Sequence, residues 1–292
     1  MRGLVFSIDD AYVLPLKVLW RSLHTTESIP ANTPIFILHE SALSEESIAD
    51  LADFIGKSGF DCSFIETSHL LPTDLPISES DHVSRTAFCR LYIANLLPES
   101  VSSVVYLDPD AVVMRSVAEL FELELEYPIA AVDAFTPHDV LRLWGECGGS
   151  YFSSGVLLID VCRWRHENYE MTFNDILAKE RARIQWWDQC VLNIAFEDNW
   201  QRLPVWYNVS RDVRKHVRAE IVDAKCKFLH FDGGYKPWLF KGKGKTYRPH
   251  RHWYEAHSQT FGSNETKSLL KSLSRKRLCL KWRKFASKYL LR

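Results

Sequence analysis

The first 65 residues alternate between short apolar runs and stretches with apolar residues at helical spacing. This order constrains the fold more than any other feature of the chain. Apolar runs cover residues 3–8, 34–38 and 60–65. Between them, residues 14–23 and 48–55 repeat apolar side chains every three or four positions, and Ser44 is placed to cap the second stretch. Strand–helix–strand–helix–strand order is typical of a parallel sheet covered by helices, which binds ligands outside the carboxyl ends of its strands.

The middle of the chain continues this alternation. Further strands are predicted at 104–107, 129–132 and 155–159, and helices at 85–97, 169–180 and 188–196. Beyond them, loops rich in Trp, Tyr, Lys and Gly are predicted up to about residue 261, apart from a short strand that ends at His230. The pattern predicts an α/β fold with a Rossmann-like, mostly parallel sheet.

Charge is distributed unevenly along the 292 residues, although the formal net charge is only −1. Residues 267–292 hold ten Lys or Arg and no Asp or Glu, which leaves 26 basic against 37 acidic residues before them. The apolar residues Leu278, Trp282, Phe285 and Tyr289 fall at helical spacing in this segment. Such a basic amphipathic helix favours an anionic membrane surface, whereas the acidic body does not indicate nucleic-acid binding. A helix packed on the body with a solvated basic face is the alternative.

The cysteines and the apolar runs indicate a compartment. Seven cysteines are widely spread and never form a C-x-x-C pair, as expected for reduced thiols in the cytosol. The first apolar run is too short for a signal peptide, and no run approaches the ~20 residues of a transmembrane helix. We therefore expect a cytoplasmic protein that associates peripherally with the inner face of the cytoplasmic membrane.

Two carboxylates follow the strand predicted at 104–107. Asp108 and Asp110 are two positions apart, so they project to the same side, and Pro109 stiffens the turn between them. Such a pair can share a hard cation with phosphate oxygens. An isolated Asp-x-Asp is a weak signal, but its place at the end of a buried strand favours a metal site.

A second segment, residues 228–238, combines an imidazole, two glycines and a lysine. A strand delivers His230, Gly233 and Gly234 then expose backbone N–H groups, and Lys236 follows two residues later. This order can supply a third metal ligand and an anion-binding loop. For an isolated histidine, a core residue followed by a glycine turn is the expected interpretation. Together with the paired carboxylates, the segment favours a joint metal and phosphate site.

With these segments, the chain resembles family 8 of the glycosyltransferases, close to the bacterial galactosyl- and glucosyltransferases of lipopolysaccharide outer-core synthesis. The resemblance extends through VFSIDDAY at 5–12, YLDPD at 106–110, YFSSGV at 151–156, WDQ at 187–189 and the loop at 230–238. It implies a GT-A fold, a UDP-hexose donor, Mn²⁺ or Mg²⁺ as the metal, and transfer with retention of anomeric configuration. The implied catalytic domain covers residues 1–261, and the basic tail covers 262–292.

The resemblance assigns the metal and the donor phosphates to five residues. Asp108, Asp110 and His230 are the implied metal ligands, and Asp108 also belongs to the donor site. Gly233 and Lys236 are implied to contact the pyrophosphate.

Three further positions match the donor-binding residues of the family. Arg90 corresponds to a donor-contacting arginine, while Asp9 and Tyr12 fall where the family holds the uridine. From spacing alone, Arg90 is as readily a salt bridge on a helix surface, and Tyr12 an aromatic packing residue.

The implied catalytic residues around the transferred sugar are Asp133, Asp188 and Gln189. Without the resemblance, Asp133 reads as a loop carboxylate and Asp188 as a helix N-cap. The chain also departs from the family, because Ala11 and Ser153 stand where asparagines are usual. A galactose or glucose donor is expected, and a glycan or glycolipid acceptor, with specificity set by residues 137–150 and the Trp186–Trp187 pair.

The implied reaction leaves alternatives open. Retention can arise from double displacement or from attack on the same face by the acceptor. The second is favoured, because Gln189 is a poor nucleophile. A catalytically silent nucleotide-sugar-binding or membrane-adapter protein of the same fold is the main alternative function. A metal-dependent phosphohydrolase with Asp108 as nucleophile is a third, although its usual companion motifs are absent.

Overall fold

The computed structural model describes residues 1–292 with the exception of 42, 79–82, 135–150, 212, 217, 235, 240–247 and 275–292. The predicted specificity loop at 137–150 and the apolar stripe at Leu278, Trp282, Phe285 and Tyr289 lie outside the described residues.

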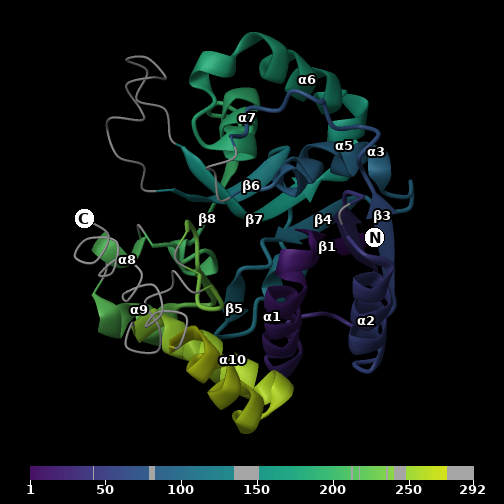
Figure 1. Ribbon diagram of the computed structural model, residues 1–292. Helices are drawn as coiled ribbons and strands as arrows, with labels where there is room; N and C mark the ends of the chain where they lie inside the picture. Colours follow the sequence, from purple (N-terminus) through teal and green to yellow (C-terminus); the bar gives the residue numbers. More distant parts are fainter. Residues whose placement is uncertain are drawn as a thin grey trace, which may run out of the picture.

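A seven-stranded sheet runs through the molecule in the order β3-β2-β1-β4-β7-β6-β8 (Figure 1). Its strands are β1 (Arg2–Ile8), β2 (Ile35–His39), β3 (Cys62–Glu66), β4 (Ser103–Leu107), β6 (Ile129–Asp133), β7 (Phe152–Asp160) and β8 (Gln201–Leu203). β7 is antiparallel to β4 and β6, and the other neighbours are parallel. The mostly parallel sheet predicted from the sequence is therefore confirmed. A separate two-stranded sheet pairs β5 (Ala111–Val113) with β9 (Phe228–His230).

Alternation along the strands divides the interior into two apolar cores. Val104 and Tyr106 of β4 face the core shared with α5 (Val161–His166), α6 (Tyr169–Lys179) and α7 (Trp187–Ala195). Val105 and Leu107 face the opposite core, shared with α1 (Val13–Thr25) and α2 (Glu45–Gly56). Because successive side chains of a strand point to opposite faces, continuous apolar runs are what a sheet covered on both sides requires. The helices lie on the two sides of the sheet in Figure 1.

The predicted helix at 85–97 is wrong over most of its length. Residues Arg85–Tyr92 form a 3₁₀ helix, and only α3 (Ile93–Leu96) is α-helical. The segment is buried almost continuously from Thr86 to Ala94, so it has no solvent face of the kind an amphipathic α-helix shows. A 3₁₀ helix is more tightly wound, and here it directs Arg90 into the interior.

The loop predicted up to residue 261 is also wrong in part. The structure has α8 (Val213–His216), α9 (Ala219–Lys225) and α10 (Arg248–Phe261). In α10, the buried positions include His250, Trp253, Tyr254 and His257, at helical spacing. Two of the core-facing residues are histidines, which hides this periodicity when only apolar residues are counted.

The helix α10 packs on α1 through a third apolar cluster, which also contains Trp253 and Leu229. Beyond Gly262, residues 263–274 are helical, and Leu269 and Leu270 pack against the same cluster. The Thr266 hydroxyl bonds to His257 Nδ1 over 2.7 Å. The beginning of the predicted tail thus rests on the body. Among the helices that can be described, none has the length and apolar character needed to span a membrane.

Candidate active site

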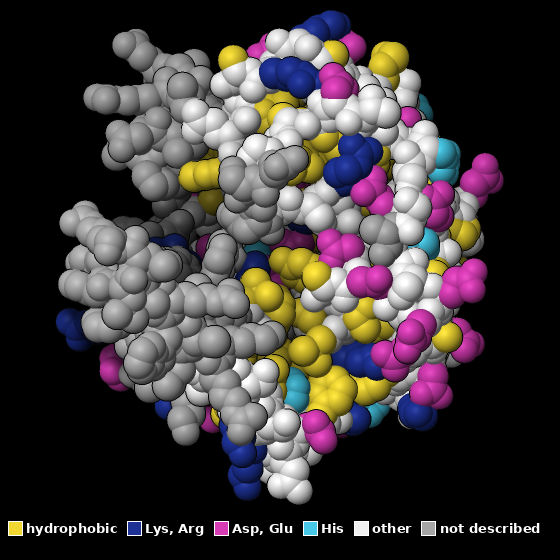
Figure 2. Space-filling view, in the orientation of Figure 1, with side chains coloured by type: hydrophobic (Ala, Val, Ile, Leu, Met, Phe, Trp, Pro, Cys, Tyr) yellow, Lys and Arg dark blue, Asp and Glu magenta, His cyan; other side chains and the backbone are white. Residues whose placement is uncertain are grey.

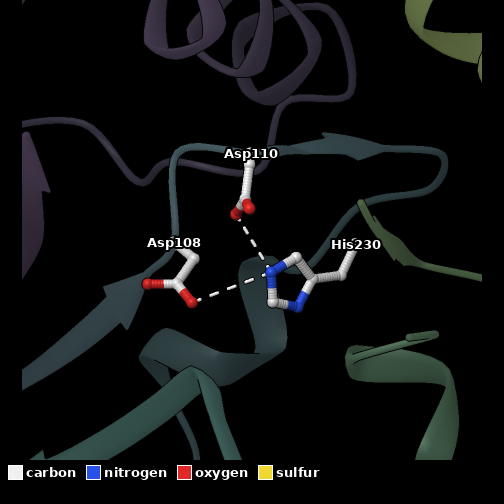
Figure 3. A group of neighbouring side chains, drawn as sticks. All are labelled: Asp108, Asp110 and His230. Atoms are coloured by element: carbon white, nitrogen blue, oxygen red, sulfur yellow. Dashed lines mark hydrogen bonds and ion pairs between the residues drawn. The ribbon is translucent and has the colours of Figure 1, made fainter. Parts of the chain in front are cut away.

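Three strand ends bring the predicted metal ligands together. Asp108 follows β4, Asp110 precedes β5 and His230 ends β9. The antiparallel pairing of β5 with β9 sets Ala111 opposite His230, which places the imidazole beside the Asp110 carboxylate. Figure 3 shows both carboxylates directed toward the same side of the imidazole ring. Pairing between β5 and β9 therefore brings the Asp108–Asp110 segment next to His230. The sequence alone marks these two segments only separately.

The three side chains direct their ligand atoms to a common point. His230 Nε2 lies 3.0 Å from Asp110 Oδ1 and 3.7 Å from Asp108 Oδ2. One ligand atom from each residue lies within 4.8 Å of the others. The two carboxylates are partly or fully buried, so neighbouring positive charge stabilises them. Oxygen and imidazole ligands suit Mn²⁺ or Mg²⁺, so the donor set fits a divalent cation.

Gly155 in β7 leaves the space that the His230 ring occupies. A Cβ atom on this residue would lie 2.4 Å from His230 Cε1 and 2.6 Å from Nδ1. The backbone here is also fixed, because the Asp108 N–H donates to the Gly155 carbonyl over 2.9 Å. Any larger residue must displace the imidazole or the strand. The glycine of the YFSSGV segment is thus required by close packing at the site.

Lys236 lies in the same buried cluster. Its ammonium contacts Asp110 Oδ2 and donates to the Phe231 carbonyl over 2.9 Å. Burial disfavours both charges, but the attraction between them outweighs it. The pKa of Asp110 is lowered by the charges of Lys236 and His230, and the pKa of Lys236 is raised by Asp110. Gly233, earlier in this loop, has φ +74°, which favours glycine.

Arg90 joins two carboxylates that belong to different segments. It is 4% exposed, so a salt bridge on the helix surface is excluded. Its Nη2 donates to Asp108 Oδ1 at 2.8 Å, its Nε lies 3.1 Å from Asp188 Oδ2, and its Nη1 donates to the Ser154 carbonyl at 2.7 Å. Burial raises the pKa of Asp188 to about 6, helped by the charge of Asp108 and opposed by Arg90. The pKa of Arg90 is raised, because the two carboxylates outweigh its burial.

These residues line one cavity of about 360 Å³. Figure 2 shows a hollow near the middle of this face, with acidic, basic and histidine side chains inside it. Most of the site residues predicted from the sequence line the cavity: Asp9, Tyr12, Arg90, Asp108, Asp110, Asp188, Gln189, His230, Gly233 and Lys236. Asp133 ends β6 and is not among the lining residues, although its neighbour Ala134 is.

The two ends of the cavity differ in character. Near Tyr12, burial raises the pKa of the phenol to about 12, and the ring meets Trp238 edge-on at 6.0 Å between centroids. At the other end, Trp186 lines the cavity and packs against Tyr151. Gln189 is held there, since its Oε1 accepts from the Ser154 N–H over 3.0 Å. Aromatic rings thus lie at both ends, and Gln189 adds a hydrogen-bonding group at the end that Trp186 lines.

Two residues of the site were not singled out from the sequence. Tyr106 donates its hydroxyl to Asp108 Oδ1 over 3.0 Å, beneath the Arg90 guanidinium. Its position two residues before Asp108 places it on the same strand face, which is a usable signal. Asn208 bonds to His230, and no motif in the sequence marks it.

The sequence is similar to those of known glycosyltransferases. A family model described as glycosyl transferase family 8 matches residues 3–242. The glycosyltransferase GlyF of Streptococcus pneumoniae is 29% identical over 248 residues, which is 81% of this chain and 57% of that protein. A lipopolysaccharide 1,2-glucosyltransferase of Escherichia coli is 29% identical over 165 residues, which is 53% of this chain and 49% of that one. The matches thus span about half the length of these two relatives.

A solved structure shows the same fold. The galactosyltransferase LgtC, in complex with donor and acceptor sugar analogues, aligns with a TM-score of 0.74 and 21% identity. The alignment covers 92% of this chain and all of that one. The expected GT-A fold is confirmed.

Proposed function

The chain belongs to glycosyltransferase family 8. We propose that this hexosyltransferase transfers the sugar of a UDP-hexose with retention of configuration. We also propose that it requires a divalent metal, with Mn²⁺ as the preferred ion. The observation that carries the proposal is the convergence of Asp108, Asp110 and His230 beside Lys236 in one cavity. The metal ligands and the ammonium together complement the negative charge of a nucleoside diphosphate.

Asp108, Asp110 and His230 would hold the metal, which when bound would supply positive charge to the pyrophosphate of the donor. Lys236 and the Gly233 N–H stabilise the negative charge of this pyrophosphate. The interaction strengthens in the transition state, so these groups act on the rate as well as on binding. Asp9 and Tyr12 hold the uridine at the end of the cavity where Tyr12 meets Trp238.

The other end of the cavity takes the hexose. Asp188 orients hydroxyl groups and stabilises positive charge at the sugar ring, and Arg90 holds it in place. Asp133 is proposed to act similarly from the end of β6. Neither carboxylate is proposed as a nucleophile, and the amide of Gln189 is a poor one. Attack on the same face by the acceptor is therefore favoured, with the leaving phosphate accepting the proton of the acceptor.

Galactose or glucose is the proposed hexose, and a glycan or glycolipid is the acceptor. The similarity to lipopolysaccharide glucosyltransferases supports an outer-core oligosaccharide as the acceptor. The basic tail would hold the enzyme at the anionic inner face of the cytoplasmic membrane, where a lipid-linked acceptor is found. Cytoplasmic location and peripheral attachment follow from this proposal.

The test is release of UDP from a panel of UDP-sugars, with and without Mn²⁺ and an oligosaccharide acceptor. We expect release that requires metal and rises with acceptor, and loss of both in excess chelator. Asp110→Asn should remove turnover while the protein stays folded. Changing a residue that only contacts a metal ligand can lower metal affinity by about 100-fold, and loss of a ligand itself is expected to lower it further. Full turnover in that variant would contradict the proposal.

The same assay separates the alternative functions. A silent binding protein would bind UDP-sugars without releasing UDP. A phosphohydrolase would release phosphate independently of acceptor. That activity needs a nucleophilic Asp108, whereas the bonds from Arg90 and Tyr106 to Asp108 Oδ1 make this oxygen a weak nucleophile.

A further inference from the structure

Asn208 is a buried amide that touches the metal-binding histidine. It is 1% exposed, and its Oδ1 lies 3.0 Å from His230 Nδ1, on the opposite side of the ring from the two carboxylates. Its Nδ2 donates to the Ser153 hydroxyl over 2.9 Å. None of the functions proposed above uses this residue. Both polar atoms of this buried amide form hydrogen bonds with residues that line the cavity, which indicates a specific function for the side chain.

The backbone fixes Asn208 relative to His230. Asn208 ends the 3₁₀ helix Val205–Tyr207, and the next residue, Val209, pairs with β9. The Val209 N–H donates to Phe228 over 2.8 Å, and the His230 N–H donates to Val209 over 3.2 Å. The two side chains therefore come from paired backbone segments, so their contact does not depend on a flexible loop.

The orientation of the amide decides which ring nitrogen carries hydrogen. A carbonyl oxygen only accepts, so Oδ1 beside Nδ1 requires an N–H there. In the neutral ring this leaves the lone pair on Nε2, the nitrogen that faces Asp108 and Asp110. The reversed amide would donate to Nδ1 and place the hydrogen on Nε2, where it opposes metal binding. In the orientation that the structure has, Oδ1 faces Nδ1 of His230 and Nδ2 donates to the Ser153 hydroxyl.

We propose that Asn208 is a positioning residue for the metal site: it holds the His230 ring and keeps the Nε2 lone pair available to the cation. The inference rests on the proposed metal-dependent function. Through Ser153, which lines the cavity, the same amide also ties the metal ligand to the wall of the sugar-binding end. Mutation of a residue that hydrogen-bonds to a metal ligand typically lowers metal affinity by about 10- to 100-fold.

The test measures binding of Mn²⁺ alone, by calorimetry and by the loss of the free-ion signal in electron paramagnetic resonance. Asn208→Leu, of similar size, should lower the affinity by about 10- to 100-fold. Asn208→Asp, which can still accept from Nδ1, should bind within about threefold of the wild type or more tightly, as in carboxylate–histidine–metal sites. Asn174→Leu is the matched control, because this amide accepts from Tyr92 away from the cavity.

A second measurement needs no substitution. With ¹⁵N-labelled histidine and Zn²⁺ as a diamagnetic probe, the imidazole spectrum should show a protonated Nδ1 and a metal-bound Nε2 for His230. Coordination through Nδ1, or wild-type Mn²⁺ affinity in a folded Asn208→Leu variant, overturns the proposal. Failure of the wild-type protein to bind any divalent metal would instead refute the metal-dependent function on which the proposal rests.

Discussion

The ammonium of Lys236 lies against Asp110 Oδ2, on the same carboxylate whose other oxygen faces His230. Both partners are buried, and the lysine also donates to the Phe231 carbonyl. A divalent cation held by Asp110 would share this carboxylate with Lys236. The lysine and the metal therefore repel each other, and a pyrophosphate between them would relieve that repulsion.

Lys236→Met should consequently change two affinities in opposite directions. Binding of Mn²⁺ alone should tighten by about tenfold, which corresponds to about 1.4 kcal/mol, because Asp110 loses a competing cation. Binding of UDP in the presence of Mn²⁺ should weaken, since a phosphate contact is lost. Calorimetric titrations with Mn²⁺, and with UDP at saturating Mn²⁺, measure the two effects.

Lys17→Met is the matched control for this prediction. Lys17 is also buried and pairs with Asp50 on the surface of α2. Its loss should lower stability slightly and leave both affinities unchanged. If Lys236→Met weakens binding of Mn²⁺ alone, the ammonium does not compete with the metal.

Gly155→Ala should damage the metal site without touching a ligand. The new methyl group would overlap the His230 ring, and relief by a shift of β7 would strain the strand. Overpacking of this kind costs about 1–3 kcal/mol of stability, and Mn²⁺ affinity should fall with it. Urea unfolding and metal titration test both effects. Gly56→Ala, where a Cβ meets nothing within 4 Å, should leave both properties near wild type.

The sequence predicts the parts of the site that depend on local pattern. Asp108 and Asp110 were found because a buried strand precedes them and alternate residues share a face. The helix α1 was predicted within two residues of its observed ends, since its apolar spacing is regular. In these segments, local periodicity and tertiary packing require the same structure.

Contacts between distant segments could not be predicted in this way. Arg90 meets Asp188 only because a 3₁₀ helix turns it inward toward α7, and sequence spacing describes a surface residue equally well. Asn208 gives no signal, since its partners Ser153 and His230 come from different sheets. Both contacts are set by the packing of elements, which periodicity along one segment does not encode.

Asp188 should make the stability of the protein depend on pH. Burial raises its pKa from 3.8 to about 6, so the folded protein binds more protons than the unfolded chain between these values. Stability therefore falls as pH rises through this window, by about 3 kcal/mol in total, and Asp188→Asn should remove that part of the loss. The difference in unfolding free energy between variant and wild type should shift in favour of the variant from pH 4 to pH 7.

Unfolding in urea at several pH values measures this difference, in which the shared titrating groups cancel. The pairing of the ionised carboxylate with Arg90 opposes the rise in the pKa of Asp188 and is already included in the net shift, so the trend keeps its sign. Asp53→Asn is the control, because its exposed ion pair with Lys57 is worth at most about 1 kcal/mol. A constant difference for Asp188→Asn across the pH range would contradict the prediction.

The two parts of the basic tail, residues 263–274 and 275–292, should have separable effects. Deleting residues 275–292 removes eight of the ten basic residues after position 266, together with the apolar stripe of Leu278, Trp282, Phe285 and Tyr289. Because 263–274 stays in place, Leu269 and Leu270 keep their contacts with the body.

This shorter protein should release UDP normally but bind anionic vesicles weakly and lose transfer to a membrane-embedded acceptor. Each Lys or Arg near the membrane surface contributes about 1 kcal/mol.

Deleting residues 267–292 should also lower thermal stability, because it exposes the apolar surface under Leu269 and Leu270. Co-sedimentation with anionic and neutral vesicles at increasing salt measures the membrane contribution, which should weaken once the Debye length falls to about 8 Å and below. Equal vesicle binding by the full chain and the 275–292 deletion would refute a membrane function for the tail. A fall in UDP release by that deletion would show instead that its stripe packs on the body.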